Sequence, residues 1–262
     1  MKIINRLLYP FVSVAAVIAA SYIASYLFNS NIIAPSPTIV LGEFVKLFSE
    51  SDFARCVLST LWRSVYGFLL SFVVALVLAV VANIGEIAEK ILYPLTLLAR
   101  AIPTMSVILL CLLWLRSDKT PVAVSFIIVF PMLYSAILSA LKSRDKEIAE
   151  MLKVYKVGKV KTFFGYTLPD VALRLYPQFV TTLSFNIKLT ISGEAMAYTG
   201  HSIGNAMKLA NMNFDTAVLL AWTIVAVLLS FAVELFLKLG ATAAVKVFNG
   251  YKDRKIKQEI CR

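Results

Sequence analysis

The residues from Gly200 to Gly204 match a spacing that hydrolytic enzymes use. In the sequence Gly-His-Ser-Ile-Gly, Ser202 stands where the Gly-x-Ser-x-Gly pattern of α/β-hydrolases has its nucleophile. That pattern works on a turn between a strand and a helix, with a separate histidine as the base. His201 is the only histidine in the chain, and it is adjacent to Ser202 in a segment between apolar runs. The match is therefore weak evidence for hydrolysis, and we expect no catalytic residue here.

Other spacings that carry chemistry do not occur in the sequence. There is no Gly-x-x-x-x-Gly-Lys-Ser/Thr segment, so the chain cannot hold ATP by that device. Cys56, Cys111 and Cys261 are widely spaced, and two of them lie in or beside apolar runs, so neither a disulfide framework nor a metal site is predicted. We expect no enzymatic activity and no cofactor bound by this chain itself.

The composition places the chain in a membrane. Of its 262 residues, 60% are apolar and 16% are charged, a balance typical of polytopic membrane proteins and not of soluble domains. The net charge of +11 would suggest nucleic-acid binding in a soluble protein. In a membrane protein, lysine and arginine residues kept on the cytoplasmic side explain it. We therefore predict an all-α protein that contacts the lipid bilayer and no nucleic acid.

A transmembrane helix needs about 20 mainly apolar residues. By that measure the sequence predicts one transmembrane domain over 1–262 with six spans, near 9–28, 57–82, 92–115, 121–141, 177–198 and 216–240. Pro94, Arg100 and Pro103 interrupt the first half of the third span, so we expect a kink or a re-entrant start there. If both termini are cytoplasmic, most lysine and arginine residues outside the spans fall on the cytoplasmic side, as the positive-inside rule requires.

Charged side chains inside the predicted spans need a partner or a cavity, because a charge near the middle of a bilayer costs roughly 2.5–3.5 kcal/mol. Arg63 and Glu194 lie at similar depths, each a few residues from the outer end of its span. We predict that they form a structural ion pair that ties the second span to the fifth.

Lys188 lies close to the middle of the fifth span, among polar residues that include Ser184, Thr190 and Ser192. In one interpretation these residues line a translocation path, where a buried ammonium group suits an anionic substrate. In the other, Lys188 is satisfied by carbonyl groups or a neighbouring helix, or it loses its charge through desolvation. The sequence favours neither.

The segment from Asp145 to Pro169 must lie in water, because it carries several lysines together with Glu147 and Glu150. Apolar residues recur in it at helical spacing, which predicts a short amphipathic helix; they are Ile148, Met151, Leu152 and Tyr155. Such a helix can dock on a partner protein or lie on anionic lipid.

This segment resembles the cytoplasmic coupling loop, or EAA loop, of permease subunits of ABC importers, most closely those of the nitrate, sulfonate and taurine group. The aspartate, the helical glutamate and the closing Leu-Pro of that loop have the spacing of Asp145, Glu150 and Leu168-Pro169. One position departs from the pattern: Lys156 replaces the usual glycine, and the nearest glycine is Gly158.

Two further blocks are similar to the same family, Ser59–Phe68 and Ala99–Pro103, and the resemblance extends from about residue 35 to about residue 205. It implies the type I importer permease fold in a prokaryotic cytoplasmic (inner) membrane, with a coupling loop over 142–176. The residues implied in coupling are Asp145, Glu147, Glu150, Met151, Tyr155, Gly158, Leu168 and Pro169.

The resemblance also implies partners and a substrate class. Two copies of the permease would form the pathway, and two ATPase subunits holding ATP and magnesium would bind the coupling loops. An extracytoplasmic solute-binding protein would deliver a small solute, such as a sulfonate, nitrate or a taurine-like anion. The alternative is an ATP-independent secondary transporter or channel, but the inverted repeat and dense ionisable residues expected of one are not evident beyond Lys188.

Overall fold

The computed structural model describes residues 2–28, 30, 32–143, 151, 154–155, 158 and 162–260. The described chain is helical and has no strand, which confirms the all-α prediction. Its elements are α1 (Lys2–Phe28), α2 (Pro37–Leu47), α3 (Phe53–Ile84), α4 (Glu86–Ala101), α5 (Thr104–Trp114), α6 (Thr120–Lys142), the π-helical turn η1 (Phe163–Thr167), α9 (Leu168–Ala197), α10 (Ile203–Met212) and α11 (Thr216–Ile260).

Three described helices are long and apolar enough to cross a membrane, namely α3, α6 and the part of α11 from Thr216 to Gly240. Together, α4 and α5 would make a fourth, broken span. In α1 the apolar helical segment Ala15–Phe28 is shorter than a span, and α9 is long but carries several charged and polar side chains. The count of six spans therefore stays a prediction.

The third predicted span is broken in two, because α4 and α5 meet at an angle of 97°. The break follows from Pro103, which has no amide hydrogen and disfavours a helical conformation at the preceding residue. Ile102 is accordingly extended, with φ −70° and ψ 128°. Pro94 lies inside α4 and does not end it. The expected interruption is thus present, but it lies at Ile102 and Pro103.

Small residues on α3 allow α6 to pack closely against it. A Cβ atom on Gly67 of α3 would lie 2.6 Å from Oγ and 2.8 Å from Cβ of Ser125 in α6, so only glycine fits at this crossing. Small residues at helix contacts let backbones approach one another in membrane proteins. A buried apolar cluster formed by α3, α6 and α9 includes Ala75, Ala79, Ala82, Val129, Leu133, Ile137, Leu175 and Leu183.

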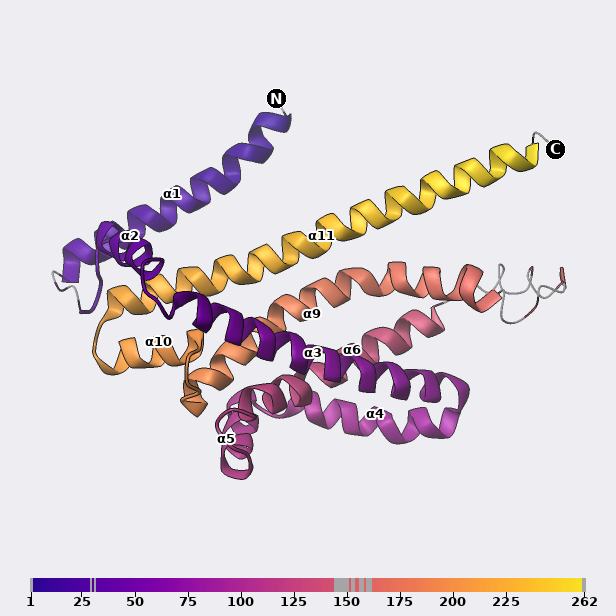
Figure 1. The fold of residues 1–262 in the computed structure, drawn as a ribbon, viewed down its shortest axis with the longest axis horizontal. Coiled ribbons are helices and arrows are strands. Elements are labelled where there is room, and N and C mark those ends of the chain that lie inside the picture. The colour runs from indigo at the N-terminus through magenta and orange to yellow at the C-terminus, as the bar shows by residue number, and fades with distance from the viewer. Residues whose placement is uncertain are drawn as a thin grey trace.

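The long helices run between two ends of the molecule (Figure 1). The end of α6, the start of α9 and the C terminus of α11 lie at one end, whereas α2 and α10 lie at the other (Figure 1). α6 packs on both α3 and α9, and α11 packs on α2, α9 and α10. The helix α9 begins at Leu168, with Pro169 in its first turn, so the last part of the predicted coupling loop over 142–176 is helical.

Candidate translocation and coupling sites

Arg63 of α3 and Glu194 of α9 form an ion pair in which Nη1 and Oε1 are 3.2 Å apart. The Glu194 side chain is fully buried, and the Arg63 side chain is 17% exposed. The second carboxylate oxygen, Oε2, accepts hydrogen bonds from the Thr60 hydroxyl at 2.8 Å and from the Gly204 amide at 3.4 Å. A buried charge is tolerated when it is paired and its other lone pairs are used. Glu194 meets both conditions, through two donors that the sequence analysis did not identify.

The hydrogen bonds around Glu194 also hold the first residues of α10 in place. The Thr60 hydroxyl, which donates to Glu194, also accepts a hydrogen bond from the Ile203 amide at 3.0 Å. A Cβ atom on Gly204 would lie 2.3 Å from the carbonyl oxygen of Ile191, so α10 can approach α9 this closely only through a glycine. Three helices, α3, α9 and α10, are therefore joined around one buried carboxylate.

Asn186 of α9 connects three helices through one fully buried side chain. Its Nδ2 donates to the Ser64 carbonyl oxygen at 2.8 Å and to the Ser64 hydroxyl at 2.9 Å, both on α3. Its Oδ1 accepts a hydrogen bond from the Ser125 hydroxyl of α6. Sequence reasoning missed this residue, although Asn186, Thr190 and Glu194 recur every four residues and so share one face of the helix.

Lys188 lies on the exposed side of α9, together with Ser192. Ser184 is partly exposed, and its hydroxyl lies 3.4 Å from Oε2 of Glu234 in α11. Thr190, in contrast, is fully buried and donates to the Asn186 carbonyl oxygen at 3.0 Å. Two residues along a helix differ by about 200° in direction, so Thr190 cannot share a face with Lys188 and Ser192. The predicted path residues are therefore reduced to Lys188, Ser184 and Ser192.

The structure describes only part of the predicted coupling segment. Asp145, Glu147 and Glu150 lie outside the described residues. The Tyr155 amide donates to the Met151 carbonyl oxygen at 3.0 Å, as in a helical turn, and the two side chains are 76% and 49% exposed. Gly158 and Leu168 are exposed as well, and Pro169 is half-buried. Exposed apolar side chains outside the bundle are available to a partner.

Ser202 caps a helix and is not arranged as a nucleophile. Its hydroxyl donates to the Thr199 carbonyl oxygen at 2.9 Å and accepts from the Asn205 amide at 3.1 Å, at the start of α10. His201 faces Asp52 instead, with Nδ1 3.7 Å from Oδ1. The Gly-x-Ser-x-Gly spacing here therefore begins a helix.

Residues 67–242 match the model of a protein family described as the binding-protein-dependent transport system inner membrane component. A relative, the formylaminopyrimidine transport permease protein ThiX of Halalkalibacterium halodurans, is 25% identical over 175 residues, which are 66% of this chain and 68% of the relative. Neither finding confirms the nitrate, sulfonate and taurine subgroup expected from the loop.

Two solved structures of inward-facing conformations of the MetNI methionine ABC transporter are similar to this chain, one from the CY5 selenomethionine soak and one from the CY5 native crystal form. Both have a TM-score of 0.55, at 14% and 17% identity respectively. The similarity covers 72% and 71% of this chain and 95% and 94% of those chains. At this identity the likeness concerns the fold alone.

Proposed function

Because the chain belongs to the family of binding-protein-dependent transport system inner membrane components, we propose that it is the membrane-spanning permease subunit of an ATP-driven ABC importer. The observation that carries the proposal is the family match over 67–242, which includes α6, α9 and the whole segment between them. The family is one of transport permeases and not of enzymes. Hydrolysis of ATP would take place on a separate partner chain.

The proposed partners are two ATPase subunits, a second copy of this permease and an extracytoplasmic solute-binding protein. The ATPases would bind the segment between α6 and α9, where Met151 and Tyr155 offer exposed apolar contacts and Glu150 would add polar ones. Closure of the ATPase pair would move this segment. Because it connects directly to α6 and α9, the movement would switch the bundle between inward-open and outward-open states.

We place both termini and the coupling segment in the cytoplasm. This orientation is supported by the positive-inside rule, because lysine and arginine residues are concentrated in the coupling segment and in the C-terminal part of the chain. The C terminus of α11 and the ends of α6 and α9 that flank the coupling segment also lie at one end of the molecule (Figure 1). On this view α2 and α10, at the opposite end, would face the solute-binding protein.

Two observations bear on the transported solute. Lys188 is exposed on α9 beside Ser192, which would suit an anion if this face lines the pathway between the two copies. The relative named above is a permease for formylaminopyrimidine, a nitrogen heterocycle. We propose a small polar solute, with this heterocycle and a taurine-like anion as the two classes to compare.

The test is purification of the tagged chain from its native membrane in mild detergent, with mass spectrometry of the proteins that accompany it. A stoichiometric ATPase that is lost in Glu150→Lys, while the variant still inserts in the membrane, would support the importer. Glu86→Lys is the matched control, because Glu86 is an exposed residue of α4 outside the coupling segment. A chain that purifies alone and moves solute in liposomes without ATP would be a secondary transporter or channel instead.

A further inference from the structure

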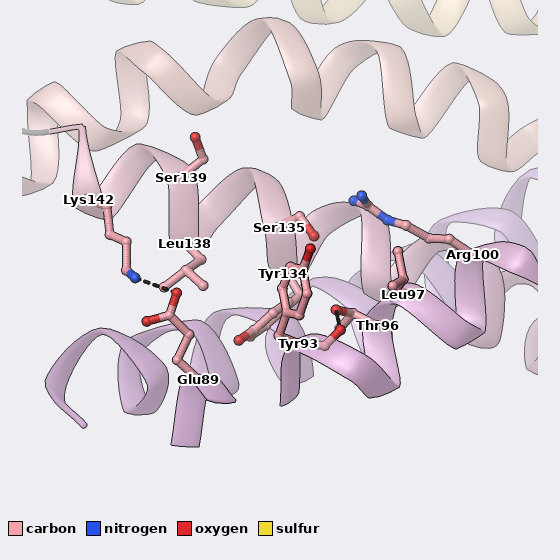
Figure 2. A pocket seen from close by; sticks show the side chains of 10 residues that line it. All are labelled: Glu89, Tyr93, Thr96, Leu97, Arg100, Tyr134, Ser135, Leu138, Ser139 and Lys142. Atoms are coloured by element: carbon pink, nitrogen blue, oxygen red, sulfur yellow. Dashed lines mark hydrogen bonds and ion pairs between the residues drawn. The ribbon is translucent and has the colours of Figure 1, made fainter. Parts of the chain in front are cut away.

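A pocket of about 310 Å³ lies between α4 and α6, and Lys188 is not one of its lining residues. Figure 2 shows its lining: Tyr93, Thr96 and Arg100 come from α4, and Tyr134 and Ser135 come from α6. An ion pair between Glu89 and Lys142 lies at the other end of the pocket from Arg100 (Figure 2). A second cavity, also lined by Arg100 and Ser135, continues the space towards Gln178 of α9.

Tyr134 leaves a hydrogen-bonding group unused in this pocket. Its side chain is only 2% exposed, and its hydroxyl has no hydrogen-bond partner among the described residues. Burial of an unpaired hydroxyl is unfavourable, so such groups in native proteins usually meet water or a ligand. The neighbouring Thr96 and Ser135 hydroxyls already donate to backbone carbonyl groups of their own helices. Of these three hydroxyls, only that of Tyr134 is not used by a described residue.

Arg100 leaves further donors unused at the end of the pocket. One of its N–H groups donates to the Pro131 carbonyl oxygen at 3.1 Å, and it forms no ion pair with any described residue. It lies roughly 20 Å along α4 from Glu86, at 1.5 Å per residue. If Glu86 lies at the membrane surface and α4 crosses the bilayer, Arg100 lies within a hydrocarbon core that is about 30 Å thick. Ionisable residues inside a membrane are rare, and they often line substrate pathways.

We infer that this pocket is the intramembrane resting site of the solute, and that it takes a small, flat nitrogen heterocycle with hydrogen-bond acceptors. The inference rests on the proposed importer function and names the site and ligand class within it. Arg100 and Tyr134 supply donors for ring nitrogen or carbonyl acceptors, and Tyr93 supplies an aromatic surface on which a ring can stack. The volume suits a small ligand, at the lower limit of known ligand pockets.

The experiment uses the complete complex of permease, ATPase and binding protein in proteoliposomes, with formylaminopyrimidine as the probe and taurine as the comparison. Uptake and ATP hydrolysis are both measured with saturating, loaded binding protein. Tyr134→Phe and Arg100→Gln are expected to lower pyrimidine uptake per ATP hydrolysed about fivefold or more, the usual effect of one lost hydrogen bond. Tyr176→Phe is the matched control, because its hydroxyl is also buried, has no partner among the described residues and does not line the pocket.

The outcomes separate this inference from the function on which it rests. Equal uptake by Tyr134→Phe and Tyr176→Phe would overturn the site. Wild-type complex that hydrolyses ATP in response to its binding protein, yet carries taurine or nothing in place of the pyrimidine, would overturn the ligand class and leave the importer standing. Absence of any ATPase partner would overturn the importer and the inference together. Thermal unfolding of each variant shows whether a loss of uptake comes from misfolding, and Tyr134→Phe should unfold no earlier than wild type.

Discussion

The carboxylate of Glu194 in α9 lies 3.2 Å from the guanidinium group of Arg63 in α3, beside the residue at which α10 begins. The two residues are far apart in sequence, so their contact holds together helices that the chain does not connect directly. Thr60 and Gly204 donate to the other carboxylate oxygen. The Glu194 carboxylate therefore holds α3, α9 and α10 together at this end of the bundle.

Glu194→Gln is expected to destabilise the protein strongly. The substitution keeps the size of the side chain but leaves Arg63 without its counter-charge, and breaking a buried ion pair from one side costs roughly 3–5 kcal/mol. The thermal midpoint in mild detergent measures this effect. Glu234→Gln is the control, because the pair of Glu234 with Lys238 is exposed and should contribute little. If Arg63→Gln combined with Glu194→Gln costs as much as the two single changes added together, the pair is not the source of stability.

Asn186→Ala is expected to cost about 2–3 kcal/mol of stability, because it removes hydrogen bonds to α3 and α6 and leaves the Ser64 and Ser125 hydroxyls buried without this partner. Thr190→Val provides the comparison. Thr190 is equally buried, but its hydroxyl bonds only to a carbonyl group of its own helix, so its loss should matter little. Similar unfolding midpoints for the two variants would contradict a role for Asn186 in joining the helices.

The long apolar helices could be predicted from the sequence, but the direction of most side chains could not. Composition and apolar run length predicted the helices. Pro94, Arg100 and Pro103 together predicted an interruption, which in the structure lies between α4 and α5 at Pro103. Arg63 and Glu194 could be matched because a charge in an apolar run has few possible partners. Uncharged polar residues give no such signal, so the contacts of Asn186 with Ser64 and Ser125 were not foreseen.

The error at Thr190 has the same origin. Ser184, Lys188, Thr190 and Ser192 were grouped by closeness in the sequence, whereas a helix separates residues by direction. Reading α9 in steps of four would have placed Asn186, Thr190 and Glu194 on one face and Lys188 and Ser192 on another. Which of the two faces is buried depends on where α3 and α6 pack, and that is a property of the assembled bundle.

Gly67→Ala is expected to destabilise the contact between α3 and α6. The new methyl group would lie 2.6 Å from Oγ of Ser125, so the helices must move apart or a side chain must shift, which typically costs about 1–3 kcal/mol. Gly42→Ala should have the opposite sign, because a Cβ atom there meets nothing within 4 Å and alanine favours a helix by about 1 kcal/mol. The two unfolding midpoints should lie on opposite sides of the wild-type value. If Gly67→Ala is neutral, the helices are not as close as the structure places them.

Lys188→Met tests whether the exposed face of α9 lines the pathway. Methionine keeps the length of the side chain and removes its charge, so an anionic solute that passes Lys188 would lose one favourable contact, and uptake of taurine should fall about tenfold. Hydrolysis of ATP stimulated by the binding protein should remain, because Lys188 lies roughly 29 Å along α9 from Pro169, where the coupling segment ends. Lys208→Met is the control, since Lys208 lies on α10 over the Tyr198 ring, 5.8 Å from its centroid. Transport of a neutral pyrimidine should be much less sensitive to Lys188→Met. If wild type takes up taurine and Lys188→Met takes it up equally well, Lys188 is not part of the pathway, and the pocket between α4 and α6 remains as the candidate site.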